Sequence, residues 1–284
     1  MTGPEKGEGL PEKGVRAELK QDRYLGPTDL THWYTPFGRV LAAVARWVGD
    51  RLGPNATLVI TVVVGAGIAL LLSIAAGQVY DAVTDSDGVA GLDRPLLDFA
   101  LTLRSPVADT VVTHFTDIAG PIGMPVIAVI AILILAIHRR SWTPVVLIAA
   151  AGGGSLLMTI AGKDLIDRAR PPLMDAVPPY EYSPSFPSGH TLNAVVVVGI
   201  IAYLLILRRK SRGARIAIGA GAVVFALAVG LSRVFLGHHW FTDVLAGWIL
   251  GAAWLALIIT AHRLYLTVRS RRPVPDPRPG SLAR

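Results

Sequence analysis

Long apolar segments separated by short polar connections make up most of this chain. Crossing about 30 Å of hydrocarbon takes roughly 20 helical residues. Six segments approach that length and are apolar enough to cross a bilayer: 57–77, 120–138, 143–161, 190–207, 214–231 and 242–262. The pattern therefore predicts an all-α polytopic membrane protein built as a bundle of six transmembrane helices.

The flanks of this predicted bundle are polar. Residues 1–29 are rich in Gly, Pro, Glu and Lys without an apolar period, which is typical of a disordered tail and not of a signal peptide. Residues 36–52 place apolar and basic positions at helical spacing, which predicts either a helix on the inner membrane face or a lead-in to the first span. We expect an N-terminal tail over 1–56, a membrane domain over 57–262 and a basic, Pro-rich tail over 263–284.

The connection between the first two predicted spans, residues 78–119, is long and hydrophilic. Its part from 96 to 118 has helical periodicity. This part is predicted to form either an interfacial helix or an extension of the second span.

Basic residues in the connections predict the orientation of the bundle, because cytoplasmic loops carry an excess of Lys and Arg. With six spans, four basic segments fall on one side. Their cations are Arg39, Arg46 and Arg51; Arg139 and Arg140; Arg208, Arg209, Lys210, Arg212 and Arg215; and Arg263, Arg269, Arg271 and Arg272. The Asp-rich connection 78–119 falls on the other side. Both termini are therefore expected in the cytoplasm.

Composition supports an integral membrane protein and excludes several other classes. Hydrophobic residues make up 52% of the chain and charged residues 17%, compared with about 25% charged in soluble domains. The absence of cysteine excludes disulfides and thiolate metal sites. The net charge of +7 suits basic loops that face anionic lipid. Nucleic acid is not expected as a partner, because no basic run is interleaved with aromatic residues.

Three polar clusters interrupt the apolar sequence, at 163–171, 187–190 and 232–243. Charge in a membrane-like sequence is costly and generally functional. The orientation above brings all three clusters to the extracytoplasmic side. Together they offer cations, histidines, a serine and a carboxylate, which are the groups needed to hold and attack a phosphate.

The first cluster contains two cations seven residues apart, Lys163 and Arg170. Two helical turns would place them on one face, before Pro171 and Pro172 break the helix. The pair could clamp a tetrahedral anion, or the two side chains could extend to lipid headgroups. The neighbouring carboxylates Asp164 and Asp167 are expected to pair with Lys163 and Arg168.

The second cluster, Pro187-Ser188-Gly189-His190, stands directly before an uncharged span. Serine is a good N-cap, and glycine lets an anion approach the backbone at a helix N-terminus. His190 would lie in the first turn. The alternative is a plain cap followed by a surface histidine.

In the third cluster, His239 and Asp243 are separated by one helical turn. A carboxylate beside an imidazole orients the ring and makes its far nitrogen more nucleophilic. Arg233 is close enough in sequence to reach the same phosphate, and His238 is assigned to packing or to the rim. Alone, the pair could equally be a structural contact that closes a loop.

The combined pattern K-x6-RP, PSGH and SR-x5-H-x3-D resembles the type 2 phosphatidic acid phosphatase (PAP2) superfamily over residues 90–262. The resemblance implies that His239 is the nucleophile that forms a phosphohistidine, that Asp243 orients it, and that His190 is the general acid and then the base. It also implies a phosphate cradle without metal or cofactor. The residues of this cradle are Lys163, Arg170, Ser188, Gly189 and Arg233.

The predicted function is hydrolysis of a lipid phosphomonoester or diphosphate at the extracytoplasmic face. Phosphatidic acid and a polyprenyl diphosphate are the candidate substrates, and membrane lipids are the expected partners. The segment 172–186 is expected to line the entrance. Alternatives are a phosphotransferase that uses the same site, a transporter with a charged substrate path, and a haloperoxidase-type enzyme that holds vanadate. The sequence leaves the oligomeric state open.

Overall fold

The structure is a computed structural model, and it describes residues 22–53 and 89–270 together with Leu19 and five positions between 54 and 88. The predicted first span, 57–77, lies almost wholly outside the described residues. The same holds for residues 1–21, of which Leu19 alone is described, and for the chain after residue 270.

Almost all regular structure in the described ranges is helical. The helices are α2 (Pro36–Leu52), η1 (Val89–Leu92), α4 (Asp93–Thr102), α5 (Pro106–Asp117), α6 (Gly123–Arg139), α7 (Thr143–Ile166), η2 (Leu173–Asp175), α8 (Gly189–Asn193), the π-helical turn η3 (Ala194–Val198), α9 (Gly199–Leu207), α10 (Arg212–Phe235) and α11 (Phe241–Arg269). The two strands, β1 (Tyr24–Leu25) and β2 (Thr28–Asp29), form a short antiparallel pair. The predicted all-α class is confirmed for this part of the chain.

Four helical segments are long and apolar enough to cross a membrane: α7, the continuous α8–η3–α9 segment, α10 and α11. α6 is apolar but shorter, with 17 residues. These five segments coincide with the last five predicted spans, although α11 continues to Arg269, beyond the predicted end at 262. Large apolar side chains of α6 and α10 are exposed on the outside of the bundle, as expected for a surface in contact with lipid.

The segment 96–118 forms parts of two helices, α4 and α5, and does not extend the second span. Ser105 caps α5 by accepting a hydrogen bond of 3.2 Å from the backbone N–H of Ala108, and Pro106 follows at the first helical position. Residues 118–122 then separate α5 from α6.

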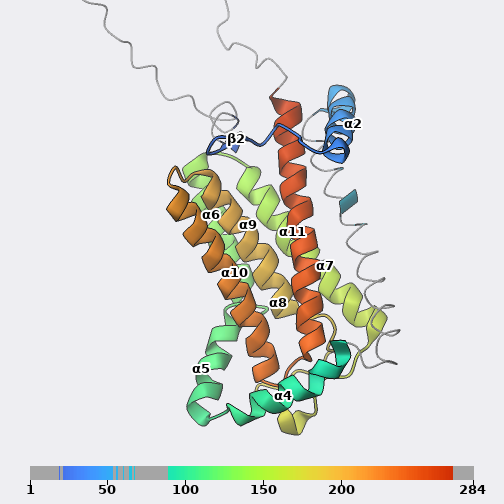
Figure 1. Cartoon of the computed structure of the whole chain (residues 1–284), viewed down its shortest axis with the longest axis vertical. Coiled ribbons are helices and arrows are strands. Elements are labelled where there is room, and N and C mark those ends of the chain that lie inside the picture. The colour runs from blue at the N-terminus through green and yellow to red at the C-terminus, as the bar shows by residue number, and fades with distance from the viewer. Residues whose placement is uncertain are drawn as a thin grey trace, which may run out of the picture.

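α11 lies at the centre of the bundle and contacts α2, α7, α8 and α10 (Figure 1). Its Trp254 is 2% exposed and belongs to the largest core cluster, with side chains from α6, α7, α8, η3 and α9. α8 and η3 approach α11 closely where α11 carries glycine. A Cβ on Gly247 would lie 3.0 Å from the Cβ of Thr191, and one on Gly251 would lie 2.9 Å from that of Val195. This close packing brings the start of α8 beside the start of α11.

The two ends of the bundle differ in chemistry. Asp22 is fully buried and lies 3.4 Å from Arg139 and 3.1 Å from Arg208, while Arg263 donates to the carbonyl of Leu30. Figure 1 shows α2 and the end of α11 at this basic end, with α4 and α5 at the other. The expectation of disorder is wrong for residues 22–29, because buried ion pairs hold this segment against the bundle.

Residues 36–52 are helical as predicted, and α2 packs along the end of α11. Small side chains face the bundle, while a stripe of large apolar side chains is exposed. The buried positions are Gly38, Ala42, Ala45 and Gly49, and the exposed ones include Phe37, Val40, Val44 and Trp47.

Gly154→Ala is expected to destabilise the bundle by about 1–3 kcal/mol, as overpacking of a filled core does. A Cβ there would lie 2.2 Å from Cε2 of the Trp254 ring. Gly153→Ala is the matched control, since nothing lies within 4 Å of a Cβ at that position. Thermal unfolding in detergent micelles should show a lower melting temperature for Gly154→Ala alone. Equal melting temperatures would contradict the close contact between α7 and α11.

Candidate active site

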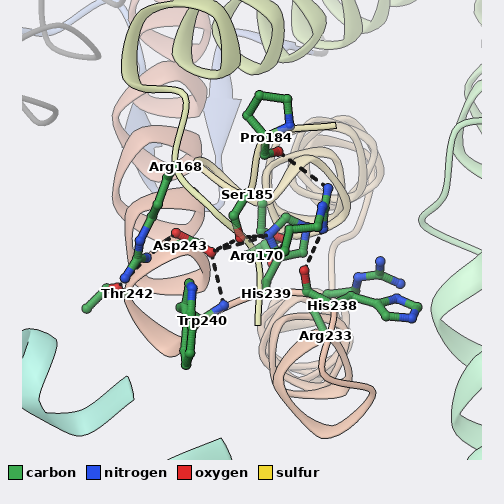
Figure 2. Close-up of polar contacts among 12 residues, drawn as sticks. Arg168, Arg170, Pro184, Ser185, Arg233, His238, His239, Trp240, Thr242 and Asp243 are labelled. Carbon is green, nitrogen blue, oxygen red and sulfur yellow. Dashed lines mark hydrogen bonds and ion pairs between the residues drawn. The ribbon is translucent and has the colours of Figure 1, made fainter. Parts of the chain in front are cut away.

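The three predicted polar clusters meet at the end of the bundle opposite the basic connections. The first cluster spans the end of α7, the second opens α8, and the third joins α10 to α11. Figure 2 shows residues of the first and third clusters close together. The segment 172–186, which was predicted to line the entrance, contributes Ser183, Pro184 and Ser185 to the same place.

His239 and Asp243 form the predicted pair, but not within one helix. α11 begins at Phe241, so His239 lies in the turn before it, and Asp243 lies in the first helical turn. His239 Nδ1 is 3.5 Å from Asp243 Oδ2. That oxygen also accepts a hydrogen bond of 3.0 Å from the backbone N–H of Trp240, so Asp243 caps α11 while it orients the histidine.

Asp243 is fully buried, and its remaining acceptor capacity is filled by side chains from two other segments. Ser185 Oγ donates to Oδ2 at 2.5 Å and lies 3.4 Å from His239 Nδ1. Arg168 Nη1 donates to Oδ1 and forms an ion pair with it. A buried carboxylate needs such a full set of donors, because an unpaired buried charge is costly.

Arg168 belongs to a second ion pair, with Asp93 at the start of α4. Its Nη2 lies 2.7 Å from Asp93 Oδ2, and Asp93 also accepts from the backbone N–H and the hydroxyl of Thr242, at 2.8 and 2.7 Å. The expectation that Arg168 pairs with Asp164 or Asp167 finds no support in these contacts. Asp93 precedes Thr242 by 149 residues, and no local pattern in the sequence could have indicated the pairing.

The far nitrogen of His239 faces Arg170, one of the cations predicted to bind phosphate. Arg170 Nη1 lies 3.2 Å from His239 Nε2. A guanidinium only donates, so Nε2 is the unprotonated nitrogen and Nδ1 carries the proton towards Asp243. Burial, together with the charges of Arg170 and Arg233, holds the pKa of the His239 imidazole well below its ordinary value. The ring is therefore neutral at physiological pH.

Lys163 and Arg170 meet, although the helical reasoning that paired them is wrong. α7 ends at Ile166, and Asp167 has a left-handed φ of 43°, which turns the chain before either proline. Both cations instead bind Ser183. Its hydroxyl accepts from Lys163 Nζ at 2.9 Å and from Arg170 Nη2 at 3.2 Å, and its carbonyl accepts from Arg170 Nε at 2.6 Å.

Arg233, at the end of α10, is the third predicted cation, and its side chain is 2% exposed. It forms an ion pair with Glu181 Oε1, while Arg170 Nη2 lies 2.8 Å from Glu181 Oε2. His238 packs beside them, with Nε2 2.7 Å from the carbonyl of Val177, and its side chain is buried, which agrees with packing, the first of the two roles expected for it. Glu181 was not identified from the sequence, since its segment has no period or motif.

The second cluster lies beside these groups. Ser188 is the N-cap residue of α8 as predicted, but its hydroxyl accepts from Thr191 Oγ1 at 2.9 Å instead of capping the helix. Gly189 and His190 form the first turn of α8. The ring of His190 lies close to the backbone at Gly120, where a Cβ would be 3.1 Å from Nε2.

The arrangement is suited to in-line attack on a tetrahedral anion. It places a neutral, oriented imidazole against Arg170, with Lys163 and Arg233 bound to the same short segment. Arg168 is not part of this anion-binding set, because Asp93 and Asp243 neutralise it. Such preorganised positive charge is the main means of stabilising charge that develops in a transition state.

Comparison with known proteins identifies the family to which the chain is similar. The sequence model of the PAP2 superfamily matches residues 141–265. Phosphatidylglycerophosphatase B of Bacillus subtilis (strain 168) is 34% identical over 176 residues, which are 60% of this chain and 83% of that protein. An undecaprenyl-diphosphatase of Sulfolobus acidocaldarius is 38% identical over 80 residues, which are 28% of this chain and 33% of that protein.

A solved structure is similar as well. It is the crystal structure of a transmembrane PAP2-type phosphatidylglycerolphosphate phosphatase from Bacillus subtilis, with a TM-score of 0.59 and 29% sequence identity. The match covers 68% of this chain and 93% of that chain.

Arg168→Gln is expected to lower the kcat for lipid phosphate hydrolysis by about 100-fold, because a small displacement of the His239–Asp243 pair has effects of that size. KM should change little, since Arg168 pairs with Asp93 and Asp243 and is not one of the cations predicted to bind phosphate. Arg168→Lys should restore part of the lost kcat. Arg94→Gln is the matched control, because its pairs with Asp98 and Asp175 involve a side chain that is 55% exposed. An unchanged kcat in Arg168→Gln would contradict the positioning role.

Proposed function

Since this chain belongs to the PAP2 superfamily and is an integral membrane phosphatase, we propose that it hydrolyses a lipid phosphomonoester through a phosphohistidine at His239. The observation that carries the proposal is the contact of 3.2 Å between Arg170 Nη1 and Nε2 of His239. A phosphoryl group bound by this guanidinium would present its phosphorus to the nucleophile.

The proposed reaction has two steps. His239 Nε2 forms a bond to phosphorus while the bond from phosphorus to the lipid oxygen breaks, and protonated His190 gives its proton to that oxygen. Neutral His190 then takes a proton from water, the resulting hydroxide attacks phosphorus, and the bond to His239 breaks to release inorganic phosphate. Asp243 stabilises the imidazolium character that His239 gains in the first step.

We further propose that the phosphoryl oxygens bind to Lys163, Arg170, Arg233, the Ser188 hydroxyl and the Gly189 N–H. These groups would supply the positive charge that other phosphatases obtain from metal ions, so the reaction is expected to need no metal.

A lipid is the favoured substrate, because the site lies at the ends of membrane-length helices, where a headgroup can reach it without leaving the bilayer. Phosphatidylglycerophosphate comes first, because it is the substrate in the names of the B. subtilis relatives. Phosphatidic acid offers the same phosphomonoester, and a polyprenyl diphosphate follows from the name of the S. acidocaldarius relative.

We also propose six spans, with both termini in the cytoplasm and the site outside. The basic segments around Asp22 lie at one end of the bundle, which supports this orientation. The domain division at 1–56, 57–262 and 263–284 remains part of the proposal. In it, α2 lies on the inner membrane face with its exposed apolar stripe in the lipid headgroup region.

His239→Gln is expected to abolish release of inorganic phosphate from phosphatidylglycerophosphate, phosphatidic acid and a polyprenyl diphosphate in detergent micelles. The variant lacks the nucleophile, and the loss should be at least about 10⁴-fold, as for removal of a nucleophile in other hydrolases. His138→Gln, an exposed histidine at the other end of the bundle, is the control and should keep full activity. Substantial turnover by His239→Gln would refute the mechanism, and the panel itself would identify the substrate.

The proposed orientation can be tested by cysteine labelling, because the natural chain has no cysteine to give a background signal. Tyr182→Cys should react with a membrane-impermeant maleimide on intact cells, since Tyr182 is 83% exposed beside the site. Trp142→Cys, which is 79% exposed between α6 and α7, should react only after lysis. The reverse pattern would show that the site faces the cytoplasm.

A further inference from the structure

Glu181 places a carboxylate between two of the cations that the proposed function assigns to phosphate. Arg170 Nη2 lies 2.8 Å from Oε2, and Arg233 forms an ion pair with Oε1. His238 Nδ1 is 3.8 Å from Oε1. Carboxylate and phosphoryl oxygens are both preferred acceptors for guanidinium groups. In this structure the side chain therefore makes the contacts that a bound phosphoryl group would make.

Burial makes this contact strong in the absence of substrate. The side chain of Arg233 is 2% exposed and that of Arg170 is 11% exposed, so each needs a counter-charge. Burial alone would raise the pKa of Glu181, but the positive charges of Arg233 and Arg170 lower it to about 2. The carboxylate is thus ionised at any physiological pH, and a substrate has to compete with a full negative charge.

The side chain of Glu181 can rotate out of the site towards solvent. Its side chain is 30% exposed, and its neighbours Tyr180 and Tyr182 are 44% and 83% exposed. Lys163 and Arg170 are additionally held by Ser183 and by the carbonyl of Pro184. Those contacts do not involve Glu181, so its side chain can turn outward while two of the three cations keep partners.

We propose that the Glu181 carboxylate occupies the anion site when no substrate is bound, and that only a more highly charged group displaces it.

The consequence is that the site selects its substrates by charge. A phosphomonoester or diphosphate carries about two or more negative charges and three free oxygens at its terminal phosphorus, whereas the phosphodiester of an ordinary membrane phospholipid carries one charge and two free oxygens. Only the former gains enough from Arg170 and Arg233 to displace the carboxylate, so the abundant diester lipids are kept out of the site. This inference rests on the proposed function, because it uses the same anion site.

Binding of an anion to Glu181→Gln tests the proposal without relying on turnover. The probe is orthovanadate, titrated calorimetrically into purified full-length protein in detergent. We expect the variant to bind it about tenfold more tightly than the unsubstituted protein, since no charge has to be displaced from the two guanidinium groups. Asp175→Asn is the matched control. It removes a carboxylate from the same segment, one that pairs with Arg94 outside the anion site, and it should leave vanadate affinity unchanged.

A second measurement tests selectivity. Phosphatidylglycerol, a phosphodiester, should inhibit hydrolysis by Glu181→Gln competitively but have little effect on the unsubstituted enzyme.

A second variant is Glu181→Asp, whose side chain is too short to reach both guanidinium groups. It should bind vanadate with intermediate affinity, and it replaces Glu181→Gln in the test if that variant does not fold. Vanadate affinity that is unchanged or weaker in both variants would overturn the proposal and indicate that Glu181 only orients Arg170 and Arg233. Absence of lipid hydrolysis by the unsubstituted protein would instead count against the proposed function, because vanadate binding is measured independently.

Discussion

The buried carboxylate of Asp243 is the contact on which the rest of the site depends. It caps the first turn of α11, faces Nδ1 of His239, and accepts from Ser185 and Arg168. Ser185 and Arg168 come from two other stretches of the chain. Burying one charge without compensation would be prohibitive, so the segment after α7, the entrance segment and the start of α11 have to assemble together. The contacts that position the site are therefore also needed for this end of the bundle to fold.

Much of the fold could be predicted from hydropathy, because five of the six apolar segments coincide with described helices. The end of α7 could not. Asp167 adopts a left-handed conformation that is unusual for a residue other than glycine, and the turn is stabilised by contacts of Arg168 with distant carboxylates. The prediction that Lys163 and Arg170 lie close together is therefore correct, but the two residues do not share a helix face as the spacing suggested. What joins them is Ser183, in a segment without any periodic signal.

The predicted site residues could be found because each lies in a short pattern at the end of a span. Their partners could not, since Asp93 and Thr242 are far apart in sequence and meet only through tertiary packing. Glu181 escaped prediction for a related reason. A single carboxylate in a Pro-rich connection belongs to no sequence motif. Its role depends on its ion pairs with Arg170 and Arg233, which form only in the folded protein.

Beside the side chains of Ser183 and Glu181, main-chain oxygens also hold the cations of the site. The carbonyls of Ser183, Pro184 and His238 accept from Arg170 or Lys163, and that of Val177 faces His238. A carbonyl is the same whichever side chain its residue carries. Side chains such as Met174 and Tyr182, 90% and 83% exposed, can therefore vary without moving the cations. Evolution could retune which lipid tail or headgroup reaches the site by altering these positions, while the phosphate-handling framework stays intact.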